Sequence, residues 1–519
     1  MPPSSIDLAR KATLAAPSLG AAWRNLGMFL QQDGAYIEAF DAYGRALELD
    51  PDDHQIALAL AFCAIRLGMK DEALSLVSYY VQARPNDQVG HVTLANVLLS
   101  LDRIPEAHDL TVNLLSAAPQ DPALWHLAGR TARASGALDE AAKALMQAAD
   151  LEPGNPRILY DLAWSRADLG QTDPALILID QAMRKNPDLE TTAALTFLKA
   201  TLLLAKGDLA GGWQAYQVRH DLALTSAAIY DLDLVRWDGL APLEGRRVLI
   251  MAEQGLGDEI AHLGLMADLI QRVGTRGRIT LCADKRLMGM IERSWPSLRA
   301  IGHKTHQTMG RRHRGPDQAV DADVWLPLGD LLPSLRPSLA HFDQARGYLR
   351  PCPDRLAHWR GWLQSLPGQV KIGMAWRSHK MDDERGRNFA PLSAWEPILS
   401  RPGASFVNLQ YGDTDAERSG LLEQFGVTVH QPPDLDLFND LEGLAALSAA
   451  LDLGIGCSNA STNLLGAVGT PLHLIAPPAP WPALGQDTYP WYPGARIYAP
   501  TVYGNWASAM QAAAQAIRA

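Results

Sequence analysis

The first half of the chain repeats a pattern of two helical stretches and a turn. Proline marks this turn at Pro17, Pro51, Pro85, Pro119, Pro153 and Pro187, each 34 residues after the last. That spacing is the period of the tetratricopeptide repeat, a pair of antiparallel helices. Proline suits the turn because it cannot continue a helix. The pattern therefore predicts an all-α solenoid of stacked helix pairs.

One small residue also recurs in each repeat. Alanine stands at Ala39, Ala73, Ala107, Ala141 and Ala175, where two helices would cross closely. The register is lost after Pro187, and the segment from Gly207 predicts a last helix that caps the solenoid. We expect the solenoid to span residues 1–220. Such arrays present a concave surface suited to extended peptides, so we expect a protein partner; the alternative is a scaffolding or oligomerising role.

From Arg246 onward the hydrophobic period changes to that of short strands. Apolar runs stand at 246–251, 278–283 and 322–328, and a second series stands at 370–376, 405–411, 427–431, 452–457, 471–476 and 495–499. Helical patterns such as 260–273 and 441–451 alternate with them. This alternation predicts two parallel sheets covered by helices. We expect two Rossmann-like lobes, residues 221–350 and 351–519, with a bridge near 348–369.

Composition and charge narrow the function. The 519 residues are 47% hydrophobic and 20% charged, as in soluble globular proteins. A net charge of -11 argues against nucleic-acid binding. No apolar run approaches the roughly 20 residues that would cross a bilayer, and the N-terminus lacks an apolar signal core. The four scattered cysteines fit neither a disulfide framework nor a zinc site, so we expect a cytoplasmic protein.

Three turns that follow predicted strands carry the candidate chemistry, because ligands of open parallel sheets collect beyond the carboxyl ends of the strands. The first turn spans Ala252–Ile260, where Gly255 and Gly257 would let the backbone turn tightly. Asp258 is either a helix cap or a general base in a cleft. The same cleft loop includes Glu253, Gln254 and His262.

The second turn, Ala375–Asn388, is rich in basic residues. Arg377, Ser378, Lys380 and Arg387 would clamp a diphosphate or a sugar carboxylate. The alternative is a solvated loop whose acidic residues neutralise the basic ones. Arg377 is the strongest candidate because it directly follows the apolar strand.

The third turn, Gly456–Pro471, begins with small polar residues before a helix. Ser458, Asn459, Ser461 and Asn463 either cap that helix or place amides and hydroxyls against a donor phosphate. Both roles are compatible, since a capped helix start binds anions.

Further residues have weaker patterns. Gln410 and Tyr411 end a predicted strand and would contact a nucleotide base or pack in the core. The late aromatic residues would form the floor of a sugar site or fill the surface between the lobes; they are Trp481, Trp491 and Tyr492. The segment 303–315 offers His303 and His306 as metal ligands, but no carboxylate stands at a telling spacing, so it is interpreted as a mobile basic surface loop.

Several motifs in order carry a family resemblance. WDGLAPLEGRRVLIMAEQGLGDEI, the WRS turn, FVNLQYGD, DLGIGCSNASTNLLGAVGTP and PWYPGARIY together resemble bacterial tetratricopeptide-repeat glycosyltransferases. Within these, the chain is most similar to transferases that modify flagellin with nonulosonic acids such as pseudaminic or legionaminic acid. More distantly it resembles lipopolysaccharide heptosyltransferases and O-GlcNAc transferases.

The resemblance implies a metal-independent GT-B enzyme that needs no cofactor and uses a nucleotide-sugar as substrate. It implies acceptor binding by the first lobe, donor binding by the second and Asp258 as the base. Heptosyltransferases have Asp-Thr/Ser and then His where this chain has Ser458, Asn459 and Asn463. Loss of a carboxylate favours a donor that carries its own, because like charges repel, and so favours a CMP-linked acidic sugar over a UDP-linked one.

The sequence therefore predicts a protein O-glycosyltransferase whose repeats recruit an acceptor such as flagellin and whose transferase domain modifies its Ser or Thr residues. Two alternatives stay open. One is a non-catalytic client-binding or assembly protein with a degenerate transferase domain. The other is a transferase that acts on a glycolipid or polysaccharide.

Overall fold

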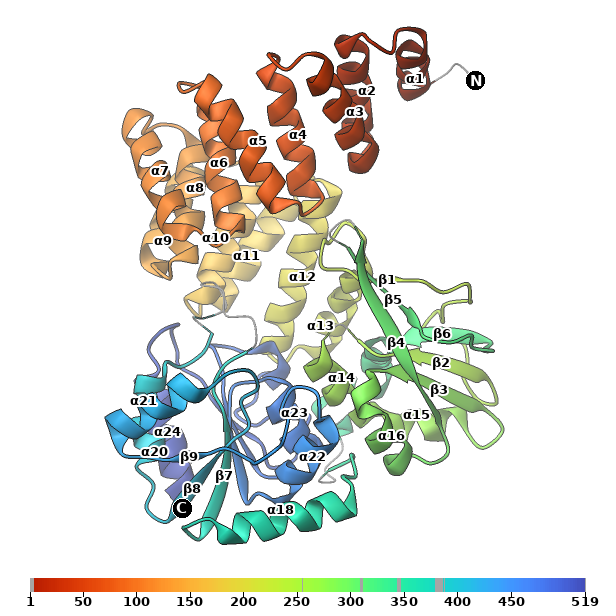
Figure 1. The fold of residues 1–519 in the computed structure, drawn as a ribbon, viewed down its shortest axis with the longest axis vertical. Coiled ribbons are helices and arrows are strands. Elements are labelled where there is room, and N and C mark those ends of the chain that lie inside the picture. Colours follow the sequence, from red (N-terminus) through yellow and green to blue (C-terminus); the bar gives the residue numbers. More distant parts are fainter. Residues whose placement is uncertain are drawn as a thin grey trace. The chain divides into compact units, whose positions relative to one another are not determined.

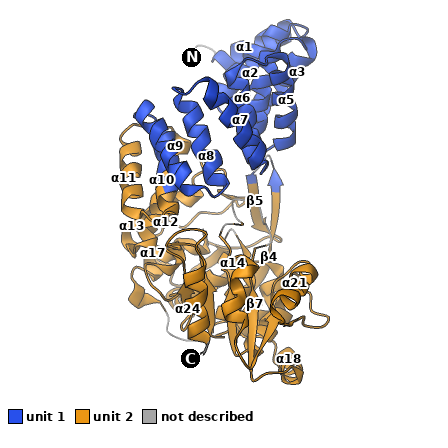
Figure 2. Cartoon of the chain, turned by 90° about the vertical axis from the view of Figure 1, so that its left-hand side faces the viewer, with its two compact units in different colours: residues 1–165, 307–311 blue, residues 166–306, 312–519 orange. Residues whose placement is uncertain are grey.

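The computed structural model describes residues 4–253, 255–308, 311–342, 347–378, 386 and 388–518. Two compact units make up the chain (Figure 2). The first consists of residues 1–165 and 307–311, and the second of residues 166–306 and 312–519.

The first unit is built from paired helices. Their bounds are α1 Ser5–Ala15, α2 Gly20–Gln32, α3 Tyr36–Leu49, α4 His54–Arg66, α5 Lys70–Ala83, α6 Gln88–Ser100, α7 Ile104–Ala117, α8 Pro122–Ala134, α9 Leu138–Leu151 and α10 Pro156–Asp168, whose last turn enters the second unit. All six periodic prolines lie outside the helices. The predicted tetratricopeptide repeats are therefore confirmed.

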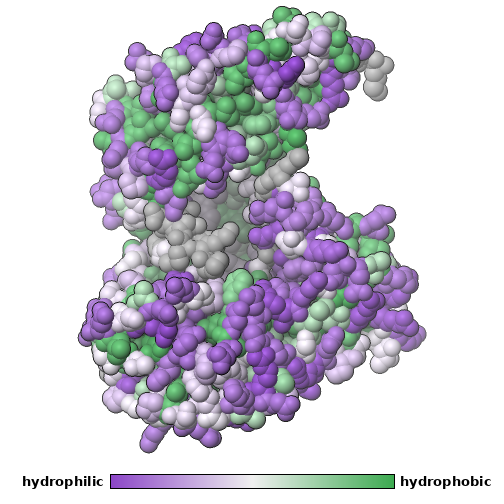
Figure 3. Space-filling model, in the orientation of Figure 1, coloured by the Kyte–Doolittle hydropathy of each residue, from purple (hydrophilic) through white to green (hydrophobic). Residues whose placement is uncertain are grey.

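Close helix packing explains the small residues of the repeat. The five periodic alanines have no exposed surface. At Gly129, an added Cβ would lie 2.4 Å from Leu145 of the paired helix, which leaves no room for a side chain. Figure 3 shows hydrophobic residues in patches on the visible face of these helices. The exposed apolar side chains of the array include Met28 and Phe62. A protein partner would cover such patches.

The second unit starts with the last helices of the array. These are α11 Thr172–Met183, α12 Leu189–Ala205, α13 Leu209–Tyr216 and the 3₁₀ turn η1 Gln217–His220. Trp213 of α13 is 1% exposed and donates its indole N–H to the Arg336 carbonyl at 2.9 Å. The predicted capping helix is therefore present as α13, and the Trp213 side chain is buried among residues of the α/β region.

Two six-stranded sheets follow (Figure 1). The first has the order β1-β5-β4-β3-β2-β6. Its strands are β1 Ile229–Tyr230, β2 Arg247–Met251, β3 Arg278–Ala283, β4 Arg299–Thr308, β5 Arg311–Pro316 and β6 Val324–Pro327. Strand β2 pairs in parallel with β3 on one side and with β6 on the other, so β2 is the switch point of the strand order in this sheet.

The second sheet has the order β12-β11-β10-β7-β8-β9, and every pair of neighbours is parallel. Its strands are β7 Val370–Ala375, β8 Ala404–Asn408, β9 Val429–His430, β10 Leu453–Gly456, β11 Leu472–Ile475 and β12 Arg496–Tyr498. This is the strand order of a doubly wound Rossmann fold, with its switch point between β7 and β10. The predicted parallel sheets are confirmed.

Helices and short 3₁₀ turns connect and cover the strands. Their bounds are α14 Leu256–His262, η2 Leu263–Leu265, α15 Met266–Val273, η3 Lys285–Leu287, α16 Met288–Ser294, η4 Leu328–Leu331, α17 Leu332–Leu335, η5 Leu339–His341, α18 Pro353–Ser365, η6 Leu392–Trp395, α20 Glu396–Leu399, α21 Asp415–Phe425, α22 Leu441–Ala450, α23 Ala460–Ala467, η7 Trp481–Ala483 and α24 Ala507–Arg518.

The prediction of a mobile surface loop at residues 303–315 is wrong. Its described residues form the outer part of β4 and most of β5. The outer half of β4 is exposed, so it shows no apolar alternation from which a strand could be predicted. Backbone pairing within the sheet, including β1 with β5, provides the strand structure instead.

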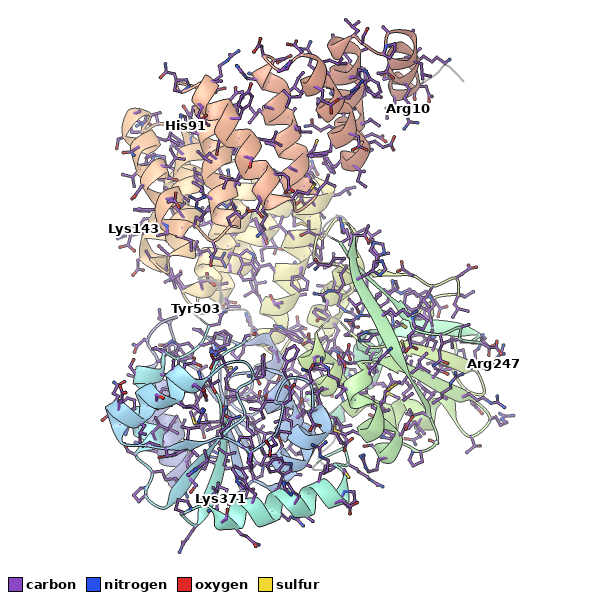
Figure 4. All side chains as sticks on the ribbon, in the orientation of Figure 1. Arg10, His91, Lys143, Arg247, Lys371 and Tyr503 are labelled. Atoms are coloured by element: carbon purple, nitrogen blue, oxygen red, sulfur yellow. The ribbon has the colours of Figure 1, made fainter. Side chains whose placement is uncertain are left out.

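Charged residues at the amino ends of two central strands have local partners. Arg247 begins β2 and pairs with Asp323, and the Lys371 ammonium near the start of β7 donates to three backbone carbonyls (Figure 4). The carboxyl ends of the same strands lead to the turns predicted to carry the chemistry. Within the described residues, every helix is too short or too polar to cross a bilayer.

Candidate functional site

A cavity of about 430 Å³ lies where the carboxyl ends of the two sheets meet. This volume is within the range of small-molecule binding sites. Its lining combines three predicted turns with an apolar wall: Leu256, Gly257, Asp258, Arg286, Ser378, Tyr411, Leu437, Phe438, Leu441, Leu444, Ser458, Asn459, Ala460, Ser461 and Asn463. Within this lining, Asp258 and Arg286 are the residues with a charge at neutral pH.

The first turns of α14 and α23 meet at this cavity. An added Cβ at Gly257 would lie 3.0 Å from the Asn463 amide nitrogen, so glycine permits the approach. Gly255 has an ordinary extended backbone (φ -122°), so its role differs from the tight turn predicted for it. The first turn of α23 carries no acidic side chain, so its N-terminus favours an anion, whereas the first turn of α14 carries the carboxylates of Asp258 and Glu259.

Capping interactions fix the start of α23. The Asn459 side chain accepts from the Thr462 amide at 3.0 Å, and the Thr462 hydroxyl accepts from the Asn459 amide at 2.9 Å. Ser461 donates to the Leu409 carbonyl at 2.8 Å. The capping interpretation therefore holds for Asn459, whereas Ser461 binds the backbone after β8 and Ser458 is exposed in the cavity.

Asp258 has the electrostatic environment expected of a base. Its residue is exposed in the cavity, yet the surrounding atoms remove much of its hydration. This desolvation raises the pKa of Asp258 to about 6, and the charges of Glu253 and Glu259 act in the same direction. A hydrogen bond with the Gly255 backbone lowers it only partly. Asp258 is thus mostly ionised at pH 7, and its pKa lies near neutral pH, as suits a general base.

Glu253 and His262 lie behind the cleft loop. Glu253 is 3% exposed and accepts from Arg219 at 3.0 Å and from the Gly329 amide at 2.9 Å. His262 is buried against Trp491, with 5.3 Å between the rings, and burial lowers the pKa of His262 to about 4. Neither side chain lines the cavity.

The Arg377 side chain is directed to a different partner from the predicted phosphate. Its guanidinium binds both carboxylate oxygens of Glu417 at 2.8 Å. Gln410 is fully buried and accepts from the amides of Trp376 and Arg377, so it holds this turn and does not reach the cavity. Ser378 of the predicted clamp and Tyr411 at the predicted strand end do line the cavity.

The aromatic candidates separate into two groups. Trp491 and Tyr492 are buried, and Tyr492 donates to the Asn463 side chain at 2.6 Å, so both fill the contact between the lobes. Trp481 lines a second cavity of about 330 Å³ beside Ser458, whose wall is mostly apolar and includes Phe389, Ile475, Pro477 and Tyr489. The remaining candidates Gln254, Lys380 and Arg387 lie outside the described residues.

Sequence reasoning missed the apolar wall of the first cavity. Leu437, Phe438, Leu441 and Leu444 come from the loop after β9 and from α22. The Arg286 guanidinium packs over the Phe438 ring, 5.3 Å from its centroid, and pairs with Asp284. The apolar spacing around α22 predicted a core helix, and only the tertiary structure shows that one side lines a cavity.

Two groups of side chains have the composition of metal ligands. His220, Glu253 and Asp330 converge, but Arg219 and Arg236 already neutralise the carboxylates. The second group corrects the interpretation of His306, because the fold brings Asp231 and His313 beside it. Strands β4 and β5, the basic hairpin, also carry Lys304, Arg311, Arg312 and Arg314. Their positive charge opposes the binding of a divalent cation.

Comparisons with known proteins agree with the repeat array. The tetratricopeptide repeat family model matches residues 30–89 and 132–200. A thermophilic tetratricopeptide-repeat protein of Thermus thermophilus aligns with a TM-score of 0.32 and 24% identity, over 35% of this chain and 98% of that one. Human protein O-mannosyl-transferase TMTC1 is 24% identical over 192 residues, which are 36% of this chain and 20% of the human protein.

A full-length similarity also exists. Protein FlbA of Caulobacter vibrioides is 37% identical over 503 residues, which cover 96% of this chain and 84% of the relative. The alignment therefore includes both the helical array and the two sheets that form the candidate site. At this identity and coverage, the chain belongs to the FlbA family.

Proposed function

We propose that this protein is a glycosyltransferase of the GT-B type that transfers a sugar from a nucleotide-sugar to a protein. The observation that carries the proposal is the cavity at the carboxyl ends of both sheets, where Asp258 faces the first turn of α23. Ligands of such sheets bind at this place. The name of the human relative supports glycosyl transfer to protein, and the repeats support a protein acceptor.

The proposed reaction is one displacement. The oxygen of an acceptor hydroxyl attacks the anomeric carbon of the donor, and Asp258 takes the hydroxyl proton. The bond from that carbon to the phosphate oxygen breaks, and the nucleotide leaves with the electron pair. The N-terminus of α23, whose first turn has no acidic side chain, would stabilise the phosphate charge. Tyr411 and the apolar wall with Phe438 would hold the base of the nucleotide.

For the donor we propose a CMP-linked acidic sugar, such as a nonulosonic acid, and for the acceptor the Ser or Thr residues of a protein such as flagellin. The wall contributed by the second sheet has hydroxyl and amide groups at Ser458, Asn459 and Asn463. A sugar carboxylate would meet no like charge there. The mostly apolar second cavity beside Ser458 would suit a sugar with acyl or methyl groups.

The direct test is intact-mass analysis of candidate acceptors incubated with purified protein and defined nucleotide-sugars. We expect one or more sugar masses added to a Ser- or Thr-bearing client with a CMP-linked acidic donor, and tighter calorimetric binding of CMP than of UDP. Tighter binding of UDP would contradict the proposed donor. Absence of any added mass with all donors and clients would contradict glycosyl transfer.

Turnover should depend on pH through Asp258. The base acts in its ionised form, so turnover should fall about tenfold per pH unit below an apparent pKa of about 6 and level off above it. Initial rates between about pH 4.5 and 8, at saturating donor, would measure this fall in turnover at low pH, the acid limb of the pH profile. An acid limb near pH 4 would mean that the base lies in a more hydrated environment than the structure has.

A further inference from the structure

The last turn of the helical array, η1, contacts the first lobe through side chains. Arg219 of η1 has a side chain that is 1% exposed, and its Nη2 donates to Glu253 at 3.0 Å and to Asp330 at 2.6 Å. The guanidinium also lies over the Tyr216 ring, 4.8 Å from its centroid. Because an unpaired buried cation is strongly unfavourable, the two carboxylates and Arg219 hold one another in place.

Glu253 connects this ion pair to the candidate base. The same oxygen that binds Arg219 also accepts from the Gly329 amide at 2.9 Å. Glu253 follows β2 and Gly329 follows β6, so this contact spans the switch point of the first sheet. Asp258 lies five residues beyond Glu253, on the first turn of α14. A residue of the array therefore holds the Glu253 side chain at the start of the loop, where Arg314 of β5 holds the backbone carbonyls of Ala252 and Glu253.

We propose that Arg219 is a positioning residue for the transfer reaction, which holds the Glu253 carboxylate at the end of β2 and thereby orients the loop that carries Asp258. This inference rests on the proposed function. It makes the end of the repeat array a part of the catalytic apparatus, in addition to any role of the repeats in binding a client.

Electrostatics supports this role. Burial raises the pKa of Glu253, but the charge of Arg219, the hydrogen bond from Arg219 and the charges of His262 and His220 together hold the pKa below its ordinary value. The ionised Glu253 in turn raises the pKa of Asp258. Arg314 of β5 is a second buried cation, which donates to the backbone carbonyls of Ala252 and Glu253 and to the Glu259 carboxylate. The other titratable or charged groups around these three residues are Tyr216, His220, Tyr230, Arg236, Glu259, His262, Arg312, Asp330, Tyr489 and Tyr492.

The test is the pH dependence of turnover in the full-length Arg219→Gln variant. Without its cation, buried Glu253 takes up a proton, and Asp258 loses a negative neighbour. The acid limb should move to lower pH by on the order of one unit. Turnover on the plateau should fall roughly ten- to a hundredfold, because a misplaced base aligns poorly. A purely structural role would lower turnover without moving the limb, and that result would overturn the proposal.

Two variants serve as matched controls. Arg219→Lys keeps a cation at the site, so the acid limb should stay near pH 6. Arg236→Gln removes a cation that binds the other oxygen of Asp330 at 2.8 Å. The acid limb of this variant should also stay near pH 6. If Arg219→Gln does not fold, Glu253→Gln removes the same negative charge and should move the limb downward. An unmoved limb in Glu253→Gln would overturn the proposal.

A second readout needs no transfer activity. A folded-state pKa raised above the unfolded value means that ionised Asp258 destabilises the fold as pH rises from about 4 to about 6. Asp258→Asn should therefore raise the melting temperature near pH 7.5 and have little effect near pH 4. In the Arg219→Gln background this gain should be smaller. An equal gain in both backgrounds would overturn the role of Arg219, even if the proposed transfer reaction itself is absent.

Discussion

Replacing Asp258 by asparagine is expected to reduce turnover about 10²–10⁴-fold, the usual contribution of a general base. Asparagine keeps the size of the side chain and can still accept the hydrogen bond from the Gly255 backbone, so α14 should start normally. Nucleotide affinity and client binding should stay within twofold of wild type. Rates from intact-mass time courses and calorimetry with CMP would measure both quantities.

The same variant separates two roles of Asp258. Gly255 is the N-cap of α14, and Asp258 lies in the first turn and bonds to the Gly255 backbone. If Asp258 only supports the helix start in this way, asparagine should replace it well, and near-normal turnover would leave Asp258 with a structural role only. Glu292→Gln is a suitable control because Glu292 is exposed on α16 of the same lobe. It removes one negative charge outside the cavity lining and should leave turnover unchanged.

A fragment of residues 166–519 is expected to fold and bind nucleotide, whereas a fragment of residues 221–519 is expected not to fold. The shorter fragment lacks Trp213, and loss of a buried tryptophan costs about 3–5 kcal/mol. It also leaves Glu253 and Asp330 without Arg219, which costs about 3–5 kcal/mol more. Together these losses approach the total stability of a typical domain, about 5–15 kcal/mol.

Circular dichroism melts and nucleotide calorimetry on both fragments would check this expectation. A cooperative melt of the 221–519 fragment at the temperature of the longer one would contradict it, and would return the boundary of the transferase region to residue 220. Fragment 166–519 is the matched control because it keeps α11, α12, α13 and η1 together with both sheets.

The sequence alone determined the parts of this protein that depend on local patterns. The 34-residue proline period and the buried alanines are properties of neighbouring helices, and both are visible as spacings. Strands such as β2, β7 and β10 are short apolar runs between helical patterns, so their positions could be predicted. The turns after these strands were therefore identified as cavity-lining segments, including Asp258, Ser378 and Ser458.

The tertiary structure alone decided which partner each polar side chain has. Arg377 binds Glu417, 40 residues away, and Arg219 binds Glu253 and Asp330 at separations of 34 and 111 residues. The apolar wall with Phe438 and the strands of the basic hairpin likewise depend on distant segments. A charged residue carries no periodic signal that names its partner. Burial and distance select the partner once the sheets and the last helices have packed together.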